Sequence, residues 1–89
     1  MKCESLKIVN KLGMHARASA KFVSLASGFK SNITLARDGR KVNGKSIMGI
    51  MMLAAAKGVA VELCVEGADE DSAFSALAGL IANRFGEDE

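Results

Sequence analysis

The sequence is short of the side chains from which small proteins build metal centres, catalytic triads and platforms for nucleobases. Its 89 residues include one histidine, two cysteines and four phenylalanines, and no proline, tryptophan or tyrosine. A single histidine with no carboxylate near it in sequence predicts no metal site, and no Ser-His-Asp or Cys-His set is visible. The two cysteines, Cys3 and Cys64, lie far apart and in no metal-binding spacing. We expect each to be reduced on a strand, which fits a cytoplasmic protein.

The chain also has little that would draw it to nucleic acid or into a membrane. Aromatic residues make up 4% of the sequence, and the net charge is only +2. Neither a stacking platform for bases nor a strong attraction to a phosphate backbone is therefore expected. No apolar run approaches the length of a membrane span, and the N-terminus has no signal-peptide pattern. The 89 residues, 49% of them apolar, predict one small domain over 1–89 with an aliphatic core.

The spacing of apolar residues predicts a regular succession of strands and helices. Alternation predicts strands over residues 4–9, 32–37, 40–43 and 59–65. Helical spacing predicts helices over 16–27, from 47 to 53, and from 70 along a stripe that ends at Phe85. Asp38-Gly39 predicts a two-residue hairpin, and Gly28 is the expected C′ residue of the first helix. The order β-α-β-β-α-β-α predicts an α+β fold, an antiparallel sheet with helices on one face.

Polar residues mark the ends of the later helices. Ser46 is the expected N-cap of the second helix. Asp69-Glu70-Asp71 is the expected cap and acidic first turn of the third. The last three residues, Glu87-Asp88-Glu89, are expected to form a frayed acidic tail.

The most informative stretch is residues 10–18, which contain the only histidine. His15 falls at or next to the N-cap of the first helix, where the first backbone N–H groups have no intrahelical partner. Those donors and the positive end of the helix dipole form a site for an anion. Arg17 in the first turn opposes the dipole, so it is badly placed for stability and well placed to meet an anion. A neutral imidazole here can accept a phosphoryl group as a nucleophile. The local pattern alone also fits a surface histidine beside a solvated arginine.

The second predicted helix is more apolar than one face of two turns can bury. Six of its seven residues from 47 to 53 are apolar, and three are methionine. Two interpretations stay open: a buried core helix, or a helix whose methionines remain exposed as an adaptable docking patch.

Residues 39–46 (GRKVNGKS) match the phosphate-binding P-loop pattern G-x-x-x-x-G-K-[ST], and a helix follows them. Gly39 is already needed for the hairpin, however, so residues 40–43 are needed as a strand. The helix that follows is short and too apolar for a solvated phosphate pocket. The chain is also too small for the parallel sheet and the separate Mg²⁺-binding aspartate of P-loop enzymes. We therefore expect no nucleotide site.

Two segments, residues 13–19 (GMHARAS) and 43–51 (NGKSIMGIM), resemble the motifs of the histidine-containing phosphocarrier (HPr) family. This family belongs to the bacterial phosphoenolpyruvate:sugar phosphotransferase system, and the resemblance covers essentially the whole chain. It implies an open-faced α/β sandwich, in which three helices cover one face of a four-stranded antiparallel sheet. It also implies that His15 takes a phosphoryl group from phosphorylated enzyme I and passes it to IIA-type acceptors of sugar permeases or regulators. Such a protein is a cytoplasmic carrier without cofactor or metal, and not an independent enzyme.

The same resemblance assigns expected roles to further residues. The backbone N–H groups of Ala16, Arg17 and Ala18, with the Arg17 side chain, would hold the phosphoryl group. The residues expected to dock enzyme I are Met14, Ile47, Met48 and Met51. Ser46 matches the position at which many members are phosphorylated by a serine kinase, so HPr serine kinase/phosphatase is a further expected partner. Ala18 departs from the family, which often has proline there, but alanine equally suits a first helical turn.

Other interpretations stay open beside this one. Within the family, a nitrogen-related regulatory branch is the alternative to sugar transport. A small acyl-phosphate hydrolase would use Arg17 with Asn10 or Asn43 to bind phosphate, and a small α+β module would bind nucleic acid. We expect a monomer that neither binds nucleic acid nor inserts into a membrane.

Overall fold

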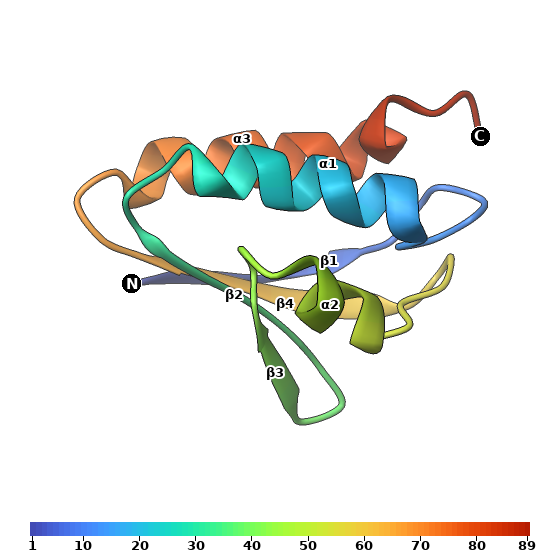
Figure 1. The fold of residues 1–89 in the computed structure, drawn as a ribbon, viewed down its shortest axis with the longest axis horizontal. Helices are drawn as coiled ribbons and strands as arrows, with labels where there is room; N and C mark the ends of the chain where they lie inside the picture. The colour runs from blue at the N-terminus through green and yellow to red at the C-terminus, as the bar shows by residue number, and fades with distance from the viewer.

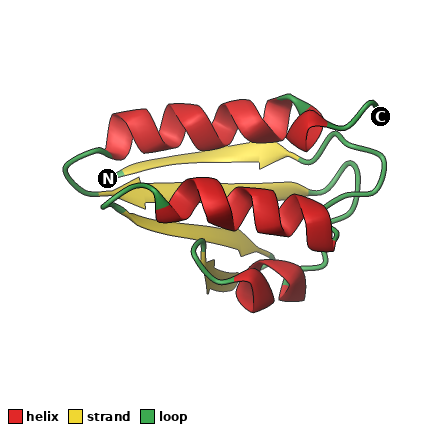
Figure 2. Ribbon diagram, turned by 45° about the horizontal axis from the view of Figure 1, so that its top comes forward, coloured by secondary structure: helices red, strands yellow, loops and turns green.

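The computed structural model describes residues 1–89 and contains the succession of elements expected from the sequence (Figure 1). In chain order these are β1 (Lys2–Lys7), α1 (Ala16–Ser27), β2 (Asn32–Arg37), β3 (Arg40–Asn43), α2 (Ile47–Met52), β4 (Ala60–Glu66), α3 (Glu70–Ala82) and a 3-10 turn, η1 (Arg84–Gly86). The four strands form one antiparallel sheet in the order β1-β4-β2-β3. The three helices cover one face of the sheet and leave the other face open (Figure 2). The predicted open-faced sandwich is confirmed.

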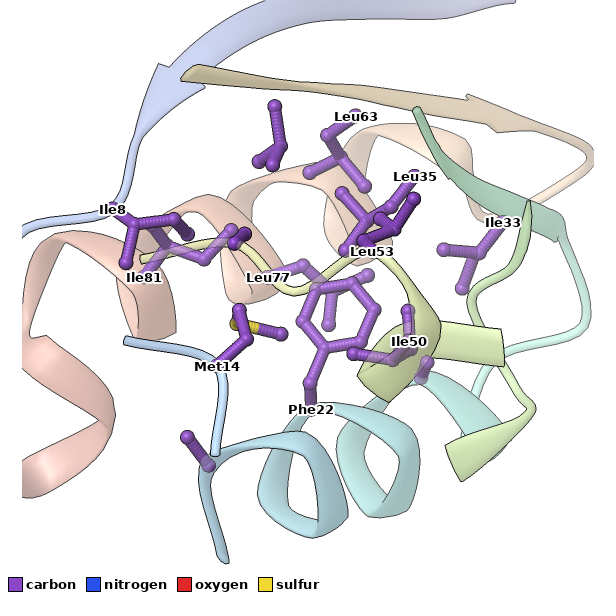
Figure 3. Close-up of a cluster of buried hydrophobic side chains, with 14 of the residues drawn as sticks. Ile8, Met14, Phe22, Ile33, Leu35, Ile50, Leu53, Leu63, Leu77 and Ile81 are labelled. Carbon is purple, nitrogen blue, oxygen red and sulfur yellow. The ribbon is translucent and has the colours of Figure 1, made fainter. Parts of the chain in front are cut away.

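The core lies between the sheet and the helices and is almost entirely aliphatic. In the central strand β4, Val61, Leu63 and Val65 are buried, and the residues between them face the open side. From the helix layer, Phe22 of α1 and Leu77 of α3 point into the same space (Figure 3). The cluster has 18 buried residues, of which three are aromatic: Phe22, Phe74 and Phe85. Small aliphatic side chains therefore fill the core, as the composition predicts.

The strands at the sheet's centre and edge begin and end slightly differently from the prediction. The β1–β4 ladder starts at Lys2, which pairs with Val65, two residues before the expected start of the first strand. β1 ends at Lys7, and β4 is displaced by one residue from its expected range. Ile8 is still fully buried, and its N–H donates to the Val59 carbonyl (2.9 Å). The apolar alternation located the strands, whereas their ends depend on pairing.

The predicted hairpin is confirmed, and the predicted end of the first helix is partly wrong. Asp38 and Gly39 have φ values of 51° and 80°, as a two-residue hairpin with both central residues left-handed requires. The stretch that matched a P-loop then forms β3, and the Gly44 N–H donates to the Ile33 carbonyl (2.7 Å). Gly28 does follow α1, but its φ is −78°, so it is a right-handed C-cap rather than a left-handed C′ glycine.

The two cysteines form a disulfide, so the expectation that each is reduced on its strand is wrong for this structure. Cys3 of β1 and Cys64 of β4 stand directly opposite each other in the ladder. Cys64 lies between the buried Leu63 and Val65, so the disulfide is on the open face of the sheet, away from the helices. Their distance in sequence hides this proximity, because only the register of β1 against β4 brings them together.

Asp69 occupies the N-cap position of α3, but its side chain does not cap that helix. Its carboxylate instead accepts hydrogen bonds from the N–H groups of Lys30 (2.8 Å) and Ser31 (3.0 Å) and from the Ser31 hydroxyl. These bonds, the one from the Ser31 hydroxyl foremost, hold the pKa of Asp69 below its ordinary value. Asp69 therefore fastens the α1–β2 connection to the start of α3, and the predicted capping role of its side chain is wrong.

None of the helices has the length and apolar character that crossing a membrane requires.

Candidate functional site

His15 is the N-cap residue of α1, at the end of the helix layer where the β1–α1 loop arrives (Figure 1). Its backbone is extended, with φ −72° and ψ 179°, and its side chain makes no capping hydrogen bond. The first-turn N–H groups of Ala16, Arg17 and Ala18 therefore have no side-chain cap, as the sequence led us to expect. The imidazole is 25% exposed, so it is reachable from solvent and still held by its surroundings.

Close backbone packing fixes the loop that carries His15. Gly13 has a φ of 66°, and a Cβ at this position would lie 2.6 Å from the Ala55 carbonyl oxygen, so no other residue fits without a shift. The Met14 N–H donates to the same carbonyl (2.9 Å). The Asn10 side chain is fully buried, and its amide donates to the Gly13 carbonyl (2.8 Å). The segment after α2 and the loop before α1 thus hold each other.

A carboxylate from the other end of the chain contacts the histidine. Glu87 Oε2 pairs with His15 Nε2, and Glu87 Oε1 accepts a hydrogen bond from Asn10 Nδ2 (3.0 Å). These contacts, the one from Asn10 foremost, hold the pKa of the Glu87 carboxyl below its ordinary value, so it is ionised at neutral pH. His15 Nδ1 makes no hydrogen bond within the protein, so it is the ring nitrogen left for chemistry.

The expectation of a frayed tail is therefore wrong for Glu87. After α3 the chain turns sharply through Arg84 and Phe85, whose φ values of 57° and 54° are left-handed. Phe85 is fully buried, and Lys21 Nζ donates to its carbonyl (2.7 Å). No local pattern in the sequence indicates this turn, because Phe85 also fits the apolar stripe of a longer helix. Its burial drives the chain inward and sends the tail back to His15.

Arg17 is exposed and makes no ion pair or hydrogen bond within the protein. Arg17 lines an open cleft of about 610 Å³, which also includes Glu87, the carboxylate that pairs with His15. Two lysines and the acidic tail complete the polar lining, namely Lys11, Lys21 and residues 87–89. A cation without an internal partner, at the positive end of a helix, is available to an anion from outside. Asn10, considered above as a phosphate ligand, is buried, and its amide nitrogen already donates to Gly13 and Glu87, while its Oδ1 has no partner.

Of the two interpretations of the second helix, the structure favours the one in which its methionines remain exposed. Ile50 is fully buried, whereas Ile47 (43%), Met48 (72%) and Met51 (42%) are exposed. Met52, the third methionine of this helix, is exposed as well (60%). Sequence reasoning missed one further exposed apolar residue, Leu12, which lies in the loop before α1. We call the four exposed residues of α2 the apolar patch, namely Ile47, Met48, Met51 and Met52.

Met14 does not belong to this patch, so its expected place on the docking surface is wrong. Its side chain is only 6% exposed and points into the core (Figure 3).

The predicted N-cap of α2 is confirmed, because the Ser46 hydroxyl accepts a hydrogen bond from the Gly49 N–H (3.1 Å). α2 runs beside the N-terminal half of α1, so the patch lies on the same side of the molecule as His15 (Figures 1 and 2).

Comparisons with known proteins agree with this arrangement. A family model described as the PTS HPr component phosphorylation site matches residues 2–83. A phosphocarrier protein HPr from Neisseria meningitidis is 57% identical over 86 residues, which are 97% of each chain. A crystal structure of HPr-C-His from Thermoanaerobacter tengcongensis superposes with a TM-score of 0.96 at 49% identity, with both chains fully covered. A structure described as an HPr dimer from the same organism is 50% identical, with a TM-score of 0.79, and covers 98% of this chain and 100% of that one.

Proposed function

The chain belongs to the HPr family of phosphocarrier proteins of the phosphotransferase system, and on that premise we propose that His15 carries the phosphoryl group. The observation that supports this most directly is the state of the imidazole at the N-terminus of α1. Nε2 is engaged by Glu87, Nδ1 has no partner, and the first-turn amides beside it have no side-chain cap. A phosphoryl group on Nδ1 would lie against donors that nothing else uses.

Arg17 and the backbone N–H groups of Ala16, Arg17 and Ala18 are the proposed phosphoryl ligands. A carrier must hold the group loosely enough to pass it on, so strong stabilisation of the loaded state would slow the second transfer. An exposed arginine at an open cleft meets this need, because solvent screens its charge. The protein then acts as a carrier with a phosphohistidine intermediate and not as an independent catalyst.

The proposed donor is phosphorylated enzyme I, and the proposed acceptors are IIA-type domains of sugar permeases or regulators in the cytoplasm. The apolar patch is the proposed docking surface, because exposed methionines adapt to more than one partner. Met48→Asp should weaken the complex with enzyme I while the fold survives, since Met48 is the most exposed residue of α2. Unchanged affinity would remove the patch from this role.

Ser46 is a proposed regulatory phosphorylation site for an HPr serine kinase/phosphatase. Its hydroxyl sits at the start of α2, next to the exposed Ile47. A phosphate of about −2 charge suits a helix N-terminus and would also change the edge of the apolar patch. A nitrogen-related regulatory branch would use the same chemistry with other acceptors.

The experiment that tests this function is incubation with labelled phosphoenolpyruvate and enzyme I, followed by mapping of the label. We expect an acid-labile, base-stable label on His15 and none on His15→Ala, whose circular dichroism should match the wild type. Full labelling of His15→Ala would end the proposal. A nucleic-acid module would instead show salt-dependent nucleic-acid binding and no label.

A further inference from the structure

We propose that Glu87 is a positioning residue for phosphoryl transfer, which holds the proton of His15 on Nε2 and so keeps the electron pair of Nδ1 free to attack phosphorus. The proposal rests on the proposed role of His15 and adds a residue that lies 72 positions away in the chain. No carboxylate near His15 in sequence could take this part.

The contact between the two side chains is partly shielded from solvent. The Glu87 side chain is 15% exposed and the imidazole 25% exposed, so their pairing is screened less than a surface ion pair. Asn10, fully buried, donates from its amide to the second carboxylate oxygen and to the Gly13 carbonyl. One buried amide thus orients both the loop before His15 and the carboxylate that meets His15.

The position of Glu87 is fixed by several independent contacts. Phe85 is buried in the core two residues earlier, and Lys21 holds its carbonyl. Backbone hydrogen bonds join Gly86 to Asn83 (3.0 Å) and Glu87 to Arg84 (2.9 Å). Beyond Glu87, the Lys11 ammonium pairs with the Glu89 carboxylate (3.3 Å). Left-handed backbone at the two non-glycine residues Arg84 and Phe85 is unfavourable, and it persists here because the surrounding contacts outweigh its cost.

The transfer step balances with Glu87 in this role. The Nδ1 electron pair forms the bond to phosphorus, the bond from phosphorus to the donor breaks, and its electron pair returns to the donor. The proton on Nε2 stays where it is, so the ring becomes positively charged while its phosphoryl group carries negative charge. The Glu87 carboxylate faces that positive ring from the Nε2 side. It therefore stabilises the charge that develops during attack, in the way a carboxylate orients a catalytic imidazole in other enzymes.

A different role for the acidic tail must be separated from this one. Glu87, Asp88 and Glu89 line the same cleft as Lys11, Arg17 and Lys21, so the tail could act merely by offsetting positive charge. Glu89 is the matched control, because it pairs with Lys11 and makes no contact with His15. Glu87→Gln and Glu89→Gln remove the same charge from the same tail. Only Glu87→Gln changes the contact with His15. Asn10 and the imidazole each donate a hydrogen bond to one carboxylate oxygen of Glu87, and an amide offers a single oxygen in place of these two.

The test uses the full chain with ¹⁵N-labelled histidine, at a pH at which the imidazole is neutral. We expect the wild type and Glu89→Gln to show Nε2 at the shift of a protonated nitrogen and Nδ1 at that of an unprotonated one. In Glu87→Gln the two shifts should move towards each other, and phosphoryl acceptance from enzyme I should slow about tenfold. Glu87→Ala, which removes both contacts, should slow it as much. Glu89→Gln should stay within about twofold of wild type.

Two outcomes would overturn the proposal while leaving the phosphocarrier function intact. In the first, Glu87→Gln keeps wild-type ring shifts and the wild-type rate, with the label still on His15. In the second, Glu87→Gln and Glu89→Gln slow transfer equally with unchanged ring shifts, which assigns the effect to the charge of the tail. Failure of the phosphocarrier function is a separate result, because the wild type itself would then take no label.

Discussion

At the scale of single residues, most groups of the site have no hydrogen-bond or ion-pair partner within the protein, which leaves them free to bind a phosphoryl group. The amides at the start of α1 have no side-chain cap, Arg17 has no internal partner, and His15 Nδ1 has no hydrogen bond. Each of these would be satisfied internally if stability alone mattered. The one group that is firmly held is Nε2, and the residue that holds it stands near the end of the chain.

The first prediction concerns Arg17, whose charge we expect to support transfer and not stability. Arg17→Ala should slow phosphoryl exchange about tenfold, the effect expected for the loss of one charge-assisted contact. The melting temperature should stay unchanged or rise slightly, because the change removes a cation from the positive end of α1. Rapid-quench kinetics and thermal melts measure the two effects. A large loss of stability with normal exchange would show that Arg17 is a packing residue.

The sequence predicted the local part of the site and missed the distant part. His15 at the helix start and Ser46 as a cap could be predicted, because each depends on neighbours within a few positions. Glu87 could not, because its contact depends on the sharp turn at Arg84 and Phe85 and on how α3 lies beside α1. The buried Met14 was misplaced for a related reason, since its direction is set by the contact of its loop with Ala55.

At the scale of elements, the β2–β3 hairpin supports α2 and thereby the apolar patch. Arg37 donates to the carbonyls of Leu53 (2.8 Å) and Ala54 (2.7 Å) at the end of the helix, and Arg40 reaches the Met52 carbonyl (3.3 Å). These cations satisfy C-terminal carbonyl groups that a six-residue helix leaves unpaired. The short helix can therefore keep its outer apolar face uncovered.

The second prediction concerns the start of this helix. Ser46→Asp should keep or raise the melting temperature, because aspartate is also a good N-cap and its charge suits the helix dipole. It should slow transfer from enzyme I, because a carboxylate at the edge of the apolar patch must be desolvated when a partner covers the patch. Ser46→Ala is the control: it should lose about 1 kcal/mol of stability and keep normal transfer. Normal transfer by Ser46→Asp would leave Ser46 as a helix cap only.

At the scale of the whole molecule, both edge strands of the sheet carry charged residues, and one of them is short. The edge strand β1 has six residues, among them Lys2, Glu4 and Lys7, and the edge strand β3 has four residues that begin with Arg40 and Lys41. Charged side chains on both edge strands, and the shortness of β3, discourage pairing with a second sheet. We therefore propose that the protein is a monomer, although a related structure is described as a dimer. A dimeric mass in solution at micromolar concentration would contradict this.

The third prediction concerns the disulfide, which joins β1 to β4 across a sequence separation of 61 residues. Closing so long a loop should stabilise the fold by about 4 kcal/mol, so reduction should lower the free energy of unfolding by up to that amount. Phosphoryl transfer should be unaffected, because Cys3 and Cys64 lie on the open face and His15 on the helix side. Denaturant unfolding with and without reductant measures the effect, and the Cys3→Ser, Cys64→Ser double variant should not respond. Slower transfer after reduction would contradict the separation of the two faces.

The central claim is that this protein carries a phosphoryl group and hands it on, and a two-step chase tests it most directly. The protein is first labelled on His15 through enzyme I and then isolated and mixed with a purified IIA-type acceptor. We predict that the label leaves His15 soon after mixing and appears on the acceptor. Little of it should be released as inorganic phosphate. A label that stays on His15, or that is released as inorganic phosphate while the acceptor remains unlabelled, would contradict the account.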